Sequence, residues 1–337
     1  VVLIDYPGFN WWIARAAKTY GIPVFYYGVP QMWAWAPWRV RKMRRLVDHV
    51  LCKLPFEVDW YKSRQCHATY VGHPYFDEVQ RQRLDQAFLD EQSRRPGRLV
   101  TILPGSRTQE VAKNLASFLK AACEIRRRVT DVRFAIASFN EKQAAMAREQ
   151  VAALDLPVDV FTGRTPELIR LGRCCLACSG SVSLELLYHA KPTVILYRVG
   201  WFAYTVARNL FIKVKFITLV NLLAADDPFL RRGARYEPRA AAGRGVLFPE
   251  HLTYEDRTQQ MAEQIAAWLS DESRYERRVR ELQELKRQHA RGGASSRAAG
   301  YILRHIGLDT PPLSGPHFDL STMPNADQRR AETEKSA

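Results

Sequence analysis

Two short turns in this chain carry residues that could bind a phosphate or a nucleoside. In the first, ILPGSRTQEV, Gly105, Ser106 and Arg107 stand between an apolar run and a helical segment. Glycine permits a tight turn, the serine and the first helix amides can contact an anion, and the arginine adds a forked cation. A capped helix start with an exposed arginine explains the same spacing equally well. The turn by itself therefore only suggests phosphate binding.

The second turn, ACSGSVSLELL, repeats this arrangement with Ser179, Gly180 and Ser181 at the start of a helix. Because both turns follow strands, they should meet at one sheet edge and form a crevice there. Glu185 lies four residues after Ser181, about one helical turn on, where a carboxylate can accept both hydroxyls of a ribose. We favour this over a carboxylate that only caps the helix.

Three further polar residues stand at chain positions where ligands often bind. Asp5 ends the run VVLID before Tyr-Pro-Gly-Phe-Asn and could act as a general base, although an Asx-turn or helix cap is slightly favoured. Asn221 stands at the end of an apolar run. A polar contact in the crevice and the cap of a turn are equally favoured roles for it. His73 in YVGHP is expected to be a hydrogen-bonded turn residue, since no metal-ligand spacing accompanies it.

A block rich in tryptophan and cations, PQMWAWAPWRVRKMRR, contains Trp33, Trp35, Trp38, Arg39, Arg41 and Lys42. Aromatic and cationic side chains together suit single-stranded nucleic acid, and they equally suit an anionic membrane interface. A helix with buried tryptophans and a solvated basic face is the third interpretation.

Composition narrows the class of protein but not its partner. The 50 Lys and Arg against 35 Asp and Glu give a formal charge of +15, which favours an anionic partner. No run approaches the about 20 apolar residues that span a bilayer, so we expect membrane contact to be peripheral. The six cysteines are scattered, and the pair Cys175 and Cys178 lacks the second pair of a zinc site, so inert core thiols are favoured.

Short apolar runs alternate with amphipathic stretches, which predicts an α/β fold of parallel strands joined by helices. Strands are expected at 1–4, 23–27, 49–53, 69–71, 99–103, 132–137, 158–161, 174–177 and 193–197. Helices are expected at 11–19, from the PGSR turn to about 129, at 141–154, from 165, and at 182–189, with two more between 254 and 305.

The predicted organisation has four parts: a partial Rossmann-like domain at 1–95, a nucleotide-binding Rossmann-like domain at 96–270, closing helices at 271–306, and a disordered tail at 307–337. The segment 233–245 is expected to be an exposed insertion, because Gly, Ala, Arg and Pro dominate it without periodicity. The first block offers few strands for a doubly wound sheet.

In their order along the chain, these motifs resemble lipid-A-disaccharide synthases. The resemblance rests on IDYPGFN, YYGVPQMWAWAPWRVRKM, LPFE, YVGHP, LPGSRTQEV, CSGSVSLELL, PTVILYRV and LVNLLA, and covers about residues 1–225. It implies a GT-B fold, in which two Rossmann-like domains face a cleft, with UDP on the C-terminal domain and a lipid-bearing acceptor beside the N-terminal one.

The resemblance also implies the reaction, an inverting hexosyl transfer without metal or other cofactor. The 6-hydroxyl of 2,3-diacylglucosamine 1-phosphate attacks UDP-2,3-diacylglucosamine, giving the β-1,6 disaccharide of lipid A, a lipopolysaccharide precursor of the Gram-negative outer membrane, and UDP. Asp5 would be the base and Arg107 would stabilise phosphate charge, with Asn10 and the tryptophan block on the acceptor and membrane side. The expected place is cytoplasmic, peripheral on the inner face of the inner membrane, with a homo-oligomer left open.

Some positions depart from the family pattern. Gly8 stands where a second Asp is usual, and Ala225 and Asp226 stand where Gly-Arg is usual. The family also begins with strands and a Gly-rich loop upstream of Val1, so the N-terminal sheet is expected to be truncated at its start. A non-catalytic UDP- or lipid-binding relative remains an alternative, and a basic nucleic-acid-binding protein a weaker one.

Overall fold

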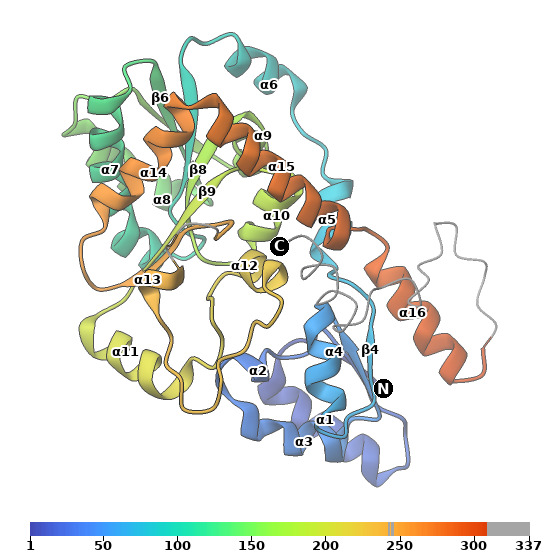
Figure 1. The fold of residues 1–337 in the computed structure, drawn as a ribbon. Coiled ribbons are helices and arrows are strands. Elements are labelled where there is room, and N and C mark those ends of the chain that lie inside the picture. The colour runs from blue at the N-terminus through green and yellow to red at the C-terminus, as the bar shows by residue number, and fades with distance from the viewer. Residues whose placement is uncertain (242, 244–245, 309–337) are drawn as a thin grey trace, which may run out of the picture.

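The protein is built on two parallel β-sheets, as seen in a computed structural model that describes residues 1–241, 243 and 246–308 (Figure 1). The smaller sheet has the order β1-β2-β3-β4, and the larger has the order β10-β9-β8-β5-β6-β7. The strands are β1 (Val2–Ile4), β2 (Phe25–Tyr27), β3 (His49–Cys52), β4 (Ala68–Tyr70), β5 (Arg98–Leu103), β6 (Val132–Ser138), β7 (Val158–Thr162), β8 (Cys174–Cys178), β9 (Thr193–Arg198) and β10 (Glu250–Thr253).

The larger sheet reverses its strand order between β5 and β8. From β5 the chain adds β6 and β7 on one side, then returns so that β8 pairs with β5 on the other, with Ile102 beside Leu176. Loops leaving two such strands diverge, which opens a crevice at their carboxyl ends where ligands of α/β proteins bind. The two predicted binding turns follow these two strands.

Helices cover both faces of the larger sheet. One face packs on α7 (Thr108–Arg128), α8 (Glu141–Ala152) and α14 (Thr258–Ser270). The other packs on α9 (Thr165–Leu171), α10 (Val182–Tyr188), α12 (Leu219–Ala224) and α15 (Glu272–His289), with α5 (Tyr75–Arg81) beside α10 and α6 (Gln86–Ser93) beside α9. Most of the core of this half is aliphatic and lies between these layers.

The smaller sheet is covered by helices from widely separated parts of the described chain. On one face lie α1 (Pro7–Thr19), α2 (Met32–Trp35), the 3₁₀ turn η1 (Pro37–Arg39), α3 (Val40–Leu46) and α4 (Pro55–Lys62). On the other lies α16 (Ala294–His305), whose Ala298 packs on Leu51 and Val71 (Figure 1). Alternate strand residues therefore face the two helix layers, as a pleated sheet requires.

The final helix is held to the first half by side chains as well as by apolar packing. Asp77 of α5 accepts hydrogen bonds from the backbone N–H groups of Ala294 and Ser295, at 3.1 and 2.9 Å, at the start of α16. A carboxylate there satisfies helix amides that have no partner within the helix. The ring of His49 lies 3.0 Å from the hydroxyl of Tyr301. The first strands and helices and the last described helix therefore build the smaller half together.

Two expectations about the last third of the chain are wrong. Three helices, not two, lie between 254 and 305, because Asp271 caps a separate helix α15 and Gly293, with φ of 83°, precedes α16. The segment 233–245 is not simply an exposed insertion, since Tyr236 and Ala241 are fully buried and α13 (Pro238–Ala241) lies within it. Hydrophobic periodicity does not predict this burial, because one aromatic side chain, Tyr236, attaches the segment to the core and no regularly spaced apolar face does so.

Some of the predicted regions lie outside the described residues: 242, 244 and 245 of that segment, and all but 307 and 308 of the predicted tail. Within the described part of the chain, no helix is both long and apolar enough to cross a membrane.

Candidate active site

A pocket of about 360 Å³ opens at the carboxyl ends of β5 and β8, at the reversal of strand order. It combines residues from both predicted turns with residues of the segment between the sheets and of neighbouring loops. Its lining is Tyr75, Leu103, Gly105, Ser106, Arg107, Glu110, Ala137, Phe139, Thr165, Cys178, Ser179, Gly180, Ser181, Val182 and Glu185.

The turn after β5 requires glycine. Gly105 has φ of 131°, and a Cβ added there would lie 2.6 Å from the Cβ of Glu110, so a side chain would be strained and would also clash. Glu110 in turn accepts a hydrogen bond from the backbone N–H of Arg107 and pairs with its guanidinium at 2.9 Å. Arg107 is 81% exposed, so it forms a cationic arm at the rim.

The turn after β8 leaves hydroxyl groups open to the pocket. Ser181 precedes α10 without a side-chain capping bond, and Gly180 beside it has open space where a Cβ would stand. Ser183 points back to the carbonyl of Gly180 at 2.8 Å, which fixes the turn from behind. Ser179 and Ser181 can therefore serve a ligand rather than the fold.

Glu185 is the buried carboxylate of the pocket, only 3% exposed. Its Oε2 accepts a hydrogen bond from the hydroxyl of Tyr75 at 2.9 Å, whereas its buried Oε1 has no partner among the described residues. Burial raises the pKa of Glu185, against the lowering effects of the Tyr75 hydrogen bond and of the neighbouring Gln82 side chain, which does not reach Oε1 in hydrogen-bonding geometry. A buried acceptor without a donor is costly, and a ligand hydroxyl would supply the donor.

The lining residues that were not identified from the sequence include Tyr75, Phe139 and Thr165. Phe139 follows β6 and Thr165 begins α9 after β7, so the carboxyl ends of the next two strands were the available signal. Tyr75 comes from the segment joining the two sheets, and only its place after the Gly-His-Pro motif marked it.

Asn221 is not a crevice contact, so its prediction as a donor-binding residue is wrong. It is 2% exposed, its amide donates to the carbonyl of Phe248 and to Glu250, and its oxygen accepts from the N–H of Phe248. With these hydrogen-bonding groups used inside the fold, the residue ties α12 to the strand β10.

At the end of β1, Asp5 projects an exposed carboxylate from a strained loop. Asp5 and Tyr6 have φ of 46° and 40°, a left-handed conformation that non-glycine residues seldom adopt. The hydroxyl of Tyr26 and the amide of Asn10 both donate to the backbone carbonyl of Asp5. The Asp5 side chain does not cap α1, whose first turn has no side-chain cap. Such strain persists where the surroundings impose it, and it is concentrated at functional sites.

Asn10 is therefore a buried support of the Asp5 loop, with its side-chain amide directed at the backbone of Ile4 and Asp5. The predicted contact with an acceptor is not what this geometry provides.

The tryptophan block divides into a buried and an exposed part. Trp33 is 1% exposed and donates through Nε1 to Glu57 at 2.9 Å, so its assignment to a membrane or acceptor surface is wrong. Trp35 and Trp38 are exposed, and the guanidinium of Arg39 lies 5.1 Å from the ring centre of Trp35. Arg41 and Lys42 are exposed as well.

His73 and the cysteines have structural surroundings. Burial, followed by the nearby charge of Lys53, lowers the pKa of His73 to about 3, and its Nδ1 accepts from the N–H of Tyr75 at 3.2 Å. Burial raises the pKa of Cys175 and of Cys178 to about 12. All six cysteines are free thiols, and the described residues contain no group of three or more side chains placed to hold a metal ion.

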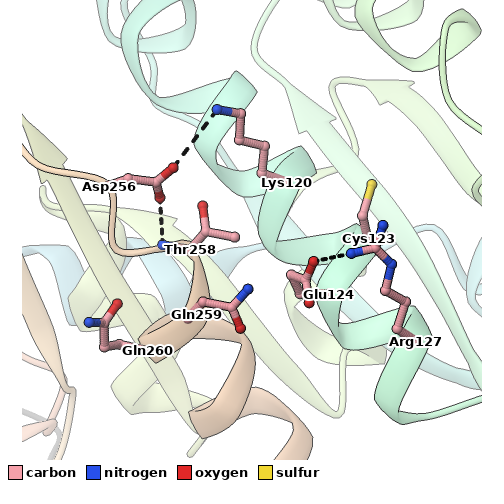
Figure 2. Close-up of a pocket in the computed structure, with 8 residues that line it drawn as sticks. All are labelled: Lys120, Cys123, Glu124, Arg127, Asp256, Thr258, Gln259 and Gln260. Atoms are coloured by element: carbon pink, nitrogen blue, oxygen red, sulfur yellow. Dashed lines mark hydrogen bonds and ion pairs between the residues drawn. The ribbon is translucent and has the colours of Figure 1, made fainter.

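A second hollow of about 510 Å³ lies between α7 and the start of α14 (Figure 2). Its charged groups pair with one another: Lys120 reaches Asp256 at 3.8 Å, Arg127 pairs with Glu124, and Asp256 accepts from the N–H of Thr258. It contains none of the predicted binding residues. We therefore take the pocket at β5 and β8 as the site.

Known proteins resemble this chain both in sequence and in fold. The lipid-A-disaccharide synthetase family matches residues 1–230. Lipid-A-disaccharide synthase of Geobacter sulfurreducens is 31% identical over 91% of this chain and 75% of its own length, and that of Idiomarina loihiensis is 36% identical over 66% and 60%. Among solved structures, the UDP co-structure of S. aureus MnaA superposes with a TM-score of 0.60, at 13% identity, over 94% of this chain and 78% of its own.

Proposed function

The chain belongs to the lipid-A-disaccharide synthase family, and from this premise we propose that it is a GT-B glycosyltransferase acting on acylated glucosamines. It moves 2,3-diacylglucosamine from UDP to the 6-hydroxyl of 2,3-diacylglucosamine 1-phosphate. The products are the β-1,6 disaccharide and UDP.

The observation that carries this proposal is the pocket at the reversal of strand order. It brings together two glycine-containing turns, the cation Arg107 at the pocket entrance and the buried Glu185. The Oε1 atom of Glu185 has no donor in hydrogen-bonding geometry among the described residues. Turn hydroxyls and amides with a cation suit a diphosphate, and a buried carboxylate suits the hydroxyls of a ribose. UDP supplies both groups.

In the proposed reaction the acceptor oxygen attacks the anomeric carbon of the donor sugar from the face opposite UDP. The new bond from oxygen to the anomeric carbon forms as the bond from that carbon to the phosphate oxygen breaks, which inverts the configuration. Asp5 takes the hydroxyl proton, and UDP leaves with the bonding electron pair. A positioned base contributes about 10²- to 10⁴-fold to such a step.

Arg107 acts at the other end of the same step. Negative charge grows on the diphosphate as UDP departs, and the arm held by Glu110 can follow the leaving group because it is mostly exposed. We propose that this charge compensation works without a metal ion. The expected result is an initial rate unchanged by EDTA, whereas a loss of rate restored by Mg²⁺ would contradict it.

We further propose that the protein works at the inner face of the inner membrane, where acylated substrates reside. The exposed Trp35 and Trp38 and the neighbouring cations support a peripheral contact, since indole rings and basic side chains favour the headgroup region of anionic bilayers.

The function is tested by incubating the chain with both lipid substrates in detergent and analysing the products by mass spectrometry. The expected result is one disaccharide formed per UDP released. If protein that is folded and binds UDP forms no disaccharide, the chain is a non-catalytic relative and the proposal fails.

A further inference from the structure

The segment formed by α11 (Trp201–Val206) and the π-helical turn η2 (Ala207–Phe211) exposes large apolar side chains that the proposed chemistry does not use. Trp201 is 62% exposed, Phe202 73% and Leu210 61%, and Phe211 is exposed as well. An isolated exposed apolar side chain is ordinary, but neighbouring ones on one element mark an interaction surface.

The opposite side of this segment is firmly attached to the larger half. Arg208 donates through Nε to the carbonyl of Tyr236 at 3.0 Å, and the ring of Tyr204 lies 5.2 Å from that of Tyr254. The exposed residues are therefore held outward by an anchored helix.

The segment adjoins the exposed part of the tryptophan block on the other half of the protein. The backbone N–H of Lys213, two residues after η2, donates to the carbonyl of Ala34 in α2 at 2.8 Å. In Figure 1, α11 lies to the left of α2, in the lower part of the view. We define the aromatic rim as the exposed aromatic and apolar residues of α11, η2, α2 and η1: Trp201, Phe202, Leu210, Phe211, Trp35 and Trp38.

The charge around the aromatic rim is mostly positive. Residues 28–47 contain five Arg or Lys and no Asp or Glu, and residues 199–225 contain Arg208, Lys213 and Lys215, again without an acidic residue. Lys215 pairs with Asp227 at 3.2 Å, whereas Lys213 is exposed. An apolar surface bordered by cations is complementary to an anionic lipid headgroup layer.

The same charge pattern argues against a second copy of this chain as the occupant. In a symmetric dimer, the same patch meets itself, so the cations of one copy would face those of the other. A lipid surface offers negative charge to all of them at once.

We propose that the aromatic rim docks the protein on an anionic bilayer, with α11 and η2 of the larger half and Trp35 and Trp38 of the smaller half resting at headgroup level together. This rests on the proposed function for its purpose, since acylated donor and acceptor would then reach their respective halves from one surface. The membrane contact thus extends beyond the tryptophan block to the nucleotide-binding half.

The test is co-sedimentation of the full chain with vesicles of phosphatidylethanolamine and phosphatidylglycerol, and with vesicles of phosphatidylcholine alone. Replacing both Trp201 and Phe202 with serine should lower the partition coefficient for the anionic vesicles at least about tenfold, since each large side chain loses its burial. A second variant, Leu210→Ser with Phe211→Ser, should act in the same direction and serves if the first does not fold.

The matched control replaces Tyr20 and Ile306, also exposed but on other elements, with serine, and should bind vesicles like the unaltered chain. UDP release from detergent-dispersed substrates should persist in the rim variants, because detergent removes the need for docking. If the unaltered chain releases no UDP there, the proposed function fails while the vesicle result still stands.

Two outcomes overturn the docking proposal. One is unchanged binding to anionic vesicles by both folded rim variants. The other is a dimer in sedimentation velocity that the rim variants convert to monomer without any change in vesicle binding, which would make the rim a subunit interface.

Discussion

The two halves of this protein present functional groups at their strand ends in opposite ways. In the larger half, Glu185 is buried and its partner Tyr75 comes from the segment between the sheets. In the smaller half, Asp5 is exposed, and the surrounding residues hold its backbone rather than its carboxylate. Under the proposed function, the nucleotide site is organised before the ligand arrives, whereas Asp5, as the proposed base, is fixed in place with its carboxylate left free.

The largest effect should come from removing the free carboxylate. Asp5→Asn keeps the shape of the side chain and abolishes its basicity, so the transfer rate should fall about 10²- to 10⁴-fold. The measurement is the initial rate of disaccharide formation at saturating substrate. Asp59→Asn, on the exposed side of α4, is the control and should leave the rate unchanged. An Asp5→Asn rate close to that of the unaltered chain would remove Asp5 from the mechanism.

Substitution of the buried Trp33 should lower the stability of the protein far more than substitution of the exposed Trp38. Trp33 is buried and bonded to Glu57, so Trp33→Ala should lower the free energy of unfolding by about 3–5 kcal/mol. Trp38 is 56% exposed, so Trp38→Ala should change it by no more than about 0.5 kcal/mol. Urea denaturation of the two variants checks this, and equal losses would show that the block is not divided as described.

An intermediate effect should appear in nucleotide binding by the larger half. Glu185→Gln replaces the carboxylate that would accept the ribose hydroxyls, so the Kd for UDP should rise roughly 10- to 100-fold. Tyr75→Phe should raise the Kd for UDP by a smaller factor. Isothermal titration calorimetry measures both. Glu57→Gln alters a buried carboxylate of the smaller half, outside the pocket, and should bind UDP normally.

The smallest effect concerns the carboxylates buried deepest in each half, Glu57 and Glu250. Burial raises the pKa of both, and that of Glu250 to about 7, despite hydrogen bonds from the N–H groups of Ile217 and Thr218. Because the folded-state pKa of Glu250 exceeds its ordinary value, its contribution to stability is full at low pH and is lost as the pH rises through about 7.

Between pH 6 and pH 8, this contribution of Glu250 should fall by about 1 kcal/mol. The measurement compares the unfolding free energy of the unaltered chain with that of Glu250→Gln at both pH values. The variant should lack this part of the decline. Parallel declines in the two proteins would show that Glu250 does not titrate in this range.

The sequence predicted the larger half better than the smaller, and the reason is local. Gly105, Ser106 and Arg107, and Ser179 to Ser181, follow long buried strands, so chain position alone brings them to one edge. Asn221 and Trp33 depend instead on contacts with Glu250 and Glu57, which lie 29 and 24 residues away along the chain. Periodicity carries no information about such partners.

The covering of the smaller sheet by α16 could not be predicted for the same reason. That contact joins residues more than 200 positions apart, as His49 and Tyr301 show with a separation of 252. The amphipathic pattern of α16 indicated a buried face, and nothing in the pattern showed which sheet it meets.

The contrast between the two halves is tested most directly by measuring UDP binding to Asp5→Asn and Glu185→Gln side by side by calorimetry, together with their transfer rates. We expect that Asp5→Asn binds UDP as tightly as the unaltered chain while losing transfer, and that Glu185→Gln loses UDP affinity. If Asp5→Asn lost UDP affinity as strongly as Glu185→Gln, or if neither variant changed it, the division of labour between the two halves would be wrong.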